Sequence, residues 1–168
     1  FYDRVLDGYG DDSVGELEGV HVGIEDISQI ATKWIEDRRI GGSPIEASTR
    51  YVKSDQKDKE GRWRYVRPKE IMDAGLGLKF ERVNDLAFEV YSKGIKRLQE
   101  YFDRKYQDEF KIPVQRDGKE VKVGRHELQG EDEKRAFKTN YMFTIRCAAL
   151  DVGRCVLPAS TLTHLGVF

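Results

Sequence analysis

The chain has 168 residues, and its 29 Lys and Arg side chains nearly balance its 30 Asp and Glu side chains. This length is enough for one domain with a sizeable core. The balanced charge argues against a general nucleic-acid or membrane-surface binder, because no net field would attract a polyanion. No apolar stretch approaches the roughly 20 residues of a membrane span, and the first residues do not form a signal peptide.

The two ends and the two cysteines suggest the setting of the protein. The chain begins at Phe1 without an initiator Met and ends at Phe168 directly after an apolar run. We therefore expect a piece of a longer protein, truncated at its C-terminal end. Cys147 and Cys155 would lie about 12 Å apart along one predicted helix, which is too far for a disulfide. Buried thiols and a reducing, cytoplasmic location are expected.

The N-terminal third has two interpretations. Residues 13–37 are rich in helix formers, and their apolar residues recur at the spacing of one helical face. Residues 20–24 could equally form a short strand that separates two helices. The glycines at 41–42 and Pro44 end the helical pattern, and the chain then runs through a loop into an extended segment. Residues 63–66 predict another strand.

The C-terminal two thirds contain the strongest helical pattern. Apolar residues recur every three or four positions over residues 78–106, which predicts a long helix that packs into the core. Residues 110–127 predict a β-hairpin around the Asp-Gly turn at 117–118. A final helix is expected over roughly residues 131–156, ending before Pro158.

One polar segment, residues 38–51, gathers arginines, a serine and a glutamate in a short loop: Arg-Arg-Ile-Gly-Gly-Ser-Pro-Ile-Glu-Ala-Ser-Thr-Arg-Tyr. Arginine offers a planar fork of donors that matches phosphate oxygens. Ser48 adds a neutral donor, and Glu46 can accept from a sugar hydroxyl or a ring N–H. In an extended segment Glu46, Ser48 and Arg50 would share one face. This pattern suits a phosphorylated ligand, although many such segments are simply solvated surface.

Two arginines of the final helix form a second candidate site. Arg146 and Arg154 are eight residues apart and lie near one helical face, with Leu150 between them. They could line an anion site. The plainer alternative is a pair of surface or ion-paired arginines, and Asp151 stands three residues before Arg154, where it can pair with it.

We expect no metal site and no catalytic nucleophile. The three histidines are scattered, and no His or Cys spacing fits zinc. Nothing in the pattern brings a serine, a histidine and an aspartate together. Ser13 is better interpreted as a helix cap, with Glu16 three residues later completing a capping box.

The polar loop resembles the signature of the flavin-dependent thymidylate synthases, R-H-R-x-x-S-x-N-E-x-S-x-R-Y. Aligned without gaps, the loop has Arg38 on the first arginine and matches the signature further at Ser43, Glu46, Ser48, Arg50 and Tyr51. A one-residue insertion at the glycines 41–42 would instead place Arg38 on the histidine and Arg39 on the second arginine. Both alignments are compatible with the sequence.

Two further segments resemble the same family, in the same order. Residues 10–17 are similar to its G-H-x-S/T-x-x-E-H, with Asp11 and Leu17 in place of the two histidines. Residues 149–158 are similar to its A-R-x-x-L-P, with Arg154 on the arginine. The segments G-D-D-S-V and T-L-T-H-L-G-V-F are similar in sequence to long, duplicated members of the family.

The resemblance implies an α+β fold with long helices packed on a small, mostly antiparallel sheet, forming a single domain over residues 1–168. It implies a flavoprotein methyltransferase of nucleotide biosynthesis, which converts dUMP to dTMP with methylenetetrahydrofolate, NADPH and FAD. The redox chemistry belongs to the flavin, so no residue of the chain is assigned as catalytic. A homo-oligomer, tetrameric in relatives, or a second domain of a longer chain would complete the site. The alternative is a non-catalytic homologue that binds nucleotide or flavin, or that scaffolds a partner domain.

Residue by residue, the resemblance assigns two ligand sets. The residues expected at dUMP are Glu46, Ser48, Arg50 and Arg154. The residues expected at FAD are Ser13, Glu16, Arg38, Arg39 and Glu46. Asp11 would bring a negative charge near the flavin pyrophosphate, and the family's C-terminal segment would follow Phe168. We therefore expect this chain by itself to bind FAD weakly.

Overall fold

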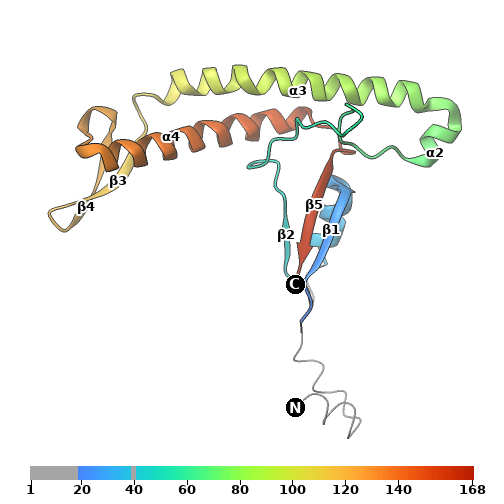
Figure 1. The fold of residues 1–168 in the computed structure, drawn as a ribbon, viewed down its shortest axis with the longest axis horizontal. Helices are drawn as coiled ribbons and strands as arrows, with labels where there is room; N and C mark the ends of the chain where they lie inside the picture. The colour runs from blue at the N-terminus through green and yellow to red at the C-terminus, as the bar shows by residue number, and fades with distance from the viewer. Residues whose placement is uncertain (1–18, 39–40) are drawn as a thin grey trace, which may run out of the picture. The chain divides into compact units, whose positions relative to one another are not determined.

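A computed structural model describes residues 19–38 and 41–168 of the chain (Figure 1). The chain divides into two compact units, which are taken one at a time below. The first comprises residues up to Ala47 together with Leu162–Phe168, and the second comprises Ser48–Thr161. Long helices and small antiparallel sheets occur together, which confirms the α+β class. No helix in the described ranges is long and apolar enough to cross a lipid bilayer.

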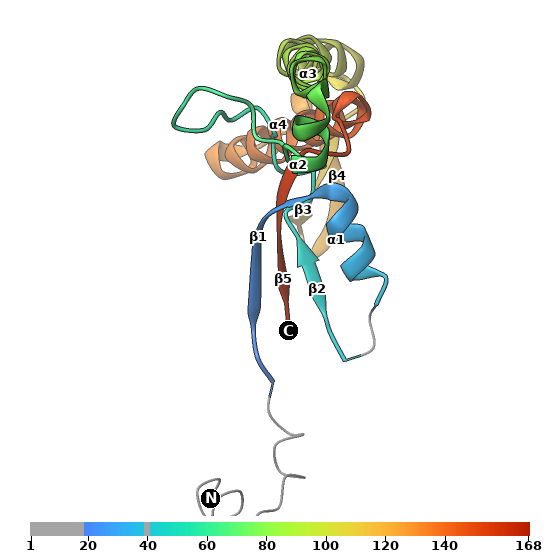
Figure 2. The same cartoon turned by 90° about the vertical axis from the view of Figure 1, so that its right-hand side faces the viewer.

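The first unit is built on a three-stranded antiparallel sheet. Its strand order is β1 (Val22–Ser28), β5 (Leu162–Val167) and β2 (Pro44–Glu46), so the last strand in the sequence lies in the middle (Figure 2). Helix α1 (Gln29–Glu36) follows β1 directly. Ser28 caps this helix, because its hydroxyl accepts a hydrogen bond from the backbone N–H of Ala31 at 3.2 Å.

The strand β1 decides between the two interpretations of the N-terminal third. A continuous helix over residues 13–37 is wrong for residues 22–28, and the alternative with a strand is confirmed, although the strand begins later and is longer than expected. The physical reason is long-range: the backbone of β1 pairs with β5, which the sequence places more than a hundred residues away. The register shifts between Ile24 and Ile27, where Asp26 adopts a φ of 54°.

The second unit is dominated by an antiparallel pair of helices, α3 (Gly77–Tyr106) and α4 (Gly130–Gly153). The start of α4 lies beside the end of α3, where the hydroxyl of Tyr141 donates to the Asp103 carboxylate at 2.7 Å. The predicted helix at 78–106 is confirmed. The expected final helix is also confirmed, except that its last residues form a 3-10 turn, η5 (Arg154–Val156). A short helix α2 (Lys69–Ile71) and a π-helical turn η3 (Met72–Leu76) precede α3.

A β-hairpin packs at one end of the helix pair. It consists of β3 (Lys111–Arg116) and β4 (Lys119–Gly124), and a short 3-10 turn, η4 (Arg125–Glu127), leads from it toward α4. Asp117 and Gly118 both have positive φ, 52° and 71°, as a tight hairpin turn requires. The predicted hairpin is therefore confirmed. Its inward residues join the helices in one core cluster: Phe102, Ile112, Val123, Phe137, Tyr141, Ile145 and Ala149.

Two expectations for the second unit are wrong. The segment 63–66 is not a strand, since it makes only isolated pairings, such as Tyr65 with Thr161. The long helix also does not bury every apolar position predicted for its core. Several are exposed instead: Leu78, Val83, Leu86 and Val90. A helix of 30 residues that packs on one neighbouring helix buries a single stripe, so residues on its other faces stay in solvent.

The two helices are in close contact at Gly153. A Cβ atom added there would lie 2.3 Å from Cδ1 of Ile95 and 3.4 Å from the ring of Tyr91, and both side chains are buried. Glycine is therefore required by packing at this point rather than by its backbone angles, which are helical. The contact fixes the end of α4 against the middle of α3.

Replacing this glycine gives the first prediction. Gly153→Ala should lower the free energy of unfolding by about 1–3 kcal/mol, because the added methyl overpacks the contact. The matched control is Gly94→Ala in α3, where an added Cβ meets no atom within 4 Å. That change should raise stability by roughly 0.5–1 kcal/mol through helix propensity. Urea denaturation in dilute solution measures both, and equal shifts in the two variants would contradict the packing role.

Candidate functional site

The segment expected to bind phosphate is a turn within the second unit. The backbone N–H groups of Tyr51 and Val52 donate to the Ser48 carbonyl at 3.0 and 2.9 Å, and the N–H of Arg50 donates to the Ser48 hydroxyl at 3.4 Å. The extended strand β2 ends earlier, at Glu46. The prediction of one shared extended face for Glu46, Ser48 and Arg50 is therefore wrong. Serine offers the backbone local hydrogen bonds that compete with an extended conformation.

The turn places Arg50 beside the end of α4. The Oδ1 atom of Asp151 lies 3.0 Å from Nε of Arg50 and 2.9 Å from Nη2 of Arg154. This oxygen is buried and makes no well-directed hydrogen bond, so the two contacts are ionic. The expected pairing of Asp151 with Arg154 is confirmed. Its second partner, Arg50, was not predicted, because nothing local in the sequence connects the two segments.

Aromatic and polar contacts hold the turn on the helix pair. Nη2 of Arg146 donates to the carbonyl of Tyr51 at 3.2 Å. The Tyr51 ring lies nearly parallel to that of Phe143, with 6.2 Å between ring centroids. Further along, the N–H of Ser54 donates to the hydroxyl of Tyr91 at 3.2 Å, and burial raises the pKa of Tyr91. The position of Arg50 is thus fixed from both helices.

The charge of this arginine cluster, defined as Arg50, Arg146, Asp151 and Arg154, is positive. The cluster contains three guanidinium groups and one carboxylate: Arg50 and Arg154 contact Asp151, and Arg146 contacts the Tyr51 carbonyl nearby. The side chains of Arg50 and Arg154 are 53% and 41% exposed, so the N–H groups that do not face Asp151 remain open to a ligand. Two guanidinium forks beside one half-exposed carboxylate can accept a doubly charged anion such as a phosphate.

The structure brings together only part of the two predicted ligand sets. Arg50 and Arg154 share Asp151, and Ser48 adjoins Arg50 in the same turn. Glu46 belongs to the first unit, where β2 pairs it with Leu165. Arg38, in the same unit, has its guanidinium 4.3 Å from the Trp34 ring centroid.

The remaining residues expected at FAD lie outside the described ranges: Ser13, Glu16 and Arg39. The capping box expected at Ser13 is among them, and the two alignments of the arginine pair are not distinguished. Within the described ranges, no group of three or more His, Cys, Asp or Glu could hold a metal ion. Both cysteines are free thiols, but Cys155 is exposed and Cys147 is only partly buried, so the expectation of buried thiols is wrong.

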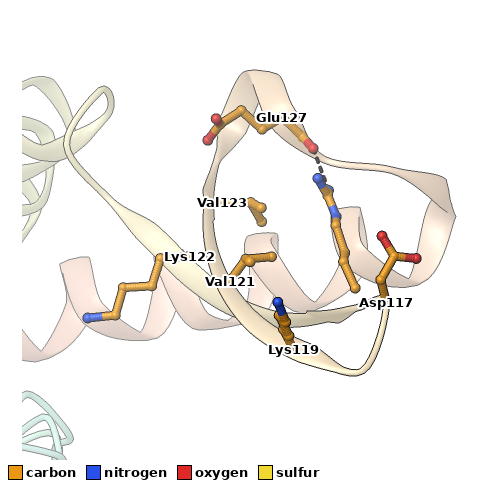
Figure 3. A pocket seen from close by; sticks show the side chains of 7 residues that line it. Asp117, Lys119, Val121, Lys122, Val123 and Glu127 are labelled. Carbon is orange, nitrogen blue, oxygen red and sulfur yellow. Dashed lines mark hydrogen bonds between the residues drawn. The ribbon is translucent and has the colours of Figure 1, made fainter.

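A separate hollow beside the hairpin is occupied by structural contacts (Figure 3). It is lined by Asp117, Lys119, Val121, Lys122, Val123 and Glu127, together with Arg116. The Arg116 guanidinium donates to the Glu127 carbonyl at 2.6 Å and to the Glu133 carboxylate at 2.8 Å. These bonds join the hairpin to α4, so this arginine serves the fold and the hollow is not assigned a ligand.

Comparison with known proteins places these features in a family. Residues 1–168 match the family described as thymidylate synthase complementing protein. The chain is 39% identical over 168 residues to a UPF0159 protein of Chlamydia pneumoniae and 38% identical over 168 residues to one of Chlamydia muridarum. It is 36% identical over 169 residues to a UPF0159 protein of Thermoplasma acidophilum. These alignments cover 99–100% of the chain but only 27–33% of the relatives, so the chain spans a third or less of their length.

Neutralising the central carboxylate tests the arginine cluster. Asp151→Asn keeps an oxygen between the guanidinium groups and removes the charge that competes with an anion. Phosphate affinity should rise by roughly fivefold, the scale of one Coulomb interaction at about 5 Å in a solvated site. Stability should change by less than about 1 kcal/mol, because the pairs are half-exposed.

The measurement is a phosphate titration followed by NMR of the Arg50 and Arg154 Nε–H groups. Asp108→Asn, which makes the same charge change just beyond the end of α3, is the control and should have no effect. Weaker phosphate binding by Asp151→Asn would show that the carboxylate positions the arginines more than it competes with the ligand.

Proposed function

Because the chain belongs to the flavin-dependent thymidylate synthase family over its whole length, we propose that it acts in the methylation of dUMP to dTMP. The observation that carries the proposal is the meeting of Arg50 and Arg154 on Asp151. These two arginines match two separate family motifs. A site for the nucleotide phosphate requires such residues to lie together, and unrelated surface arginines would have no reason to converge.

The two arginines bind the phosphate, and Ser48 adds a hydroxyl donor from the same turn. Glu46 binds the sugar or base of the nucleotide and borders the flavin. Ser13, Glu16, Arg38 and Arg39 bind FAD. The flavin supplies hydride transfer, with NADPH as the reductant and methylenetetrahydrofolate as the carbon donor, so the side chains mainly bind and orient the reactants. The reaction is assigned to the cytoplasm and to an assembly with further copies or with a second domain.

A second candidate function is a homologue that binds nucleotide without catalysis. It is favoured by Asp11 and Leu17, which stand where the family motif has histidines. In that case the arginine cluster still binds dUMP, but the flavin set is incomplete. The two functions are therefore separated by flavin binding rather than by nucleotide binding.

Removing Arg50 tests the nucleotide site. Arg50→Ala should weaken dUMP binding by roughly 1.5–3 kcal/mol, the scale of a hydrogen bond to a charged group. Deoxyuridine, which lacks the phosphate, should bind wild type and variant alike. Calorimetry with both ligands measures this difference, and Arg135→Ala in α4, away from the cluster, is the control. Equal dUMP affinity in wild type and Arg50→Ala would show that Arg50 does not contribute to nucleotide binding.

Flavin binding separates the enzyme from the non-catalytic homologue. The 168-residue chain should bind FAD weakly, while the longer protein that contains it should bind FAD measurably, because Asp11 repels the pyrophosphate and further contacts come from outside the chain. Quenching of flavin fluorescence, titrated against both proteins, measures the two affinities. Absence of binding by the longer protein would favour the homologue without catalysis, and tight binding by the short chain would show that Asp11 does not repel the cofactor.

A further inference from the structure

Helix α4 holds Tyr51 at two points, its backbone and its ring. Nη2 of Arg146 donates to the Tyr51 carbonyl at 3.2 Å. The ring of Phe143 lies within 4° of parallel to the Tyr51 ring, with the centroids 6.2 Å apart. Phe143 and Arg146 are three residues apart in the helix, so their side chains leave it on the same side. We call these three residues the Tyr51 clamp.

The carbonyl that Arg146 binds lies at the end of a single helical turn. The N–H of Val52 donates to the Ser48 carbonyl at 2.9 Å, four residues back, as in an α-helix. The last carbonyl groups of such a turn have no donor within it, and a positive charge at this end is favourable. The Arg146 guanidinium supplies both the donor and the charge. It therefore stabilises the turn that carries Arg50.

The contacts of Arg146 differ from those of the other two arginines of the cluster. Arg50 and Arg154 both lie against the Asp151 carboxylate. Arg146 binds a neutral backbone carbonyl, and the described contacts of the chain include no ion pair for it. Because Asp151 marks the position where the guanidinium groups meet an anion, this difference assigns Arg146 to the turn rather than to the ligand.

One helix thus determines where Arg50 lies. The clamp fixes Tyr51, the neighbour of Arg50 in the chain, and Asp151 fixes the Arg50 side chain. Residues 146 and 151 lie about 7.5 Å apart along the axis of α4, so both anchors belong to one rigid segment. Arg154 directly follows this helix. The separation of the two phosphate-binding arginines is therefore set by α4.

We propose that Arg146 and Phe143 are positioning residues of the phosphate site, which hold Tyr51 so that Arg50 faces Asp151. They act on a bound phosphate only through Arg50. Neither residue belongs to the three segments that resemble the family motifs. The role at a nucleotide rests on the proposed function, whereas the clamp itself rests on the contacts of Tyr51.

Phosphate affinity in single and double variants tests this role. Arg146→Ala should weaken binding of inorganic phosphate by roughly fivefold, the scale of one net hydrogen bond. Phe143→Ala should weaken it by roughly threefold, the scale of an aromatic pair, although Phe143 has no charge to offer and inorganic phosphate has no ring. In an Arg50→Ala background both changes should have no effect, because the residue that they position is absent. NMR of the Arg154 Nε–H group follows the titrations in all variants.

The order of the Arg50 side chain is a second readout, measured without any ligand. The heteronuclear NOE of the Arg50 Nε–H should fall in Arg146→Ala and in Phe143→Ala. That of Arg154 should not change, because this arginine pairs with Asp151 three residues before it. Arg146→Lys keeps a charged donor and should restore most of the Arg50 value.

Two controls remove exposed side chains of α4 outside the clamp. Arg135→Ala matches the loss of an arginine, and Met142→Ala matches the loss of an exposed apolar side chain. Both should behave like wild type. Tyr51 and Phe143 are 54% and 55% exposed, so the clamp variants should keep the fold, as circular dichroism would show.

Three results would overturn the proposal. Weaker phosphate binding that persists in the Arg50→Ala background would show that Arg146 contacts the anion directly. An unchanged Arg50 NOE, or an equal fall at Arg154, would show that the clamp does not position Arg50. A wild-type chain that binds no phosphate would remove the anion site and the role together. The expected phosphate and NOE results without dUMP binding in calorimetry would support the clamp and contradict only the proposed function.

Discussion

The arrangement of the second unit depends on the close contact of α3 and α4 at Gly153. Tyr91 takes part twice: its ring lies near the position that a Cβ at residue 153 would occupy, and its hydroxyl accepts the hydrogen bond from Ser54. The contact that fixes the end of α4 therefore also fixes the segment that carries Arg50. Asp151 and Arg154, on either side of Gly153, meet Arg50 as a consequence of this packing.

Asp151 gives the arginine cluster two properties that oppose each other. Its carboxylate holds two guanidinium groups together, which otherwise would repel. It also occupies part of the position that an anionic ligand would take, which reduces affinity. Because both arginines are about half-exposed, each keeps donors for a ligand while it pairs with Asp151. Under the proposed function, a phosphate with two charges would compete with the single carboxylate for guanidinium groups that Asp151 already holds together.

Local patterns predicted the elements that local interactions determine. The long helix at 78–106 follows from its apolar spacing, and the hairpin follows from the Asp-Gly turn, where both residues have positive φ. The strand β1 and its partner β5 depend on pairing between distant segments. The alternation of Thr161, Thr163 and Leu165, all buried, was a strand signal that the prediction left unused. For the candidate site, Arg50 and Arg154 were proposed from motifs and the pairing of Asp151 with Arg154 from their spacing, whereas the contact of Asp151 with Arg50 required the three-dimensional structure.

The most direct test of the proposed nucleotide site is a crystal structure of the chain with dUMP bound. The phosphate is predicted to lie within hydrogen-bond distance of the guanidinium groups of both Arg50 and Arg154, with the Asp151 carboxylate displaced from between them. A nucleotide whose phosphate contacts neither arginine, with the contacts of Asp151 unchanged, would contradict the assignment of the arginine cluster as its binding site.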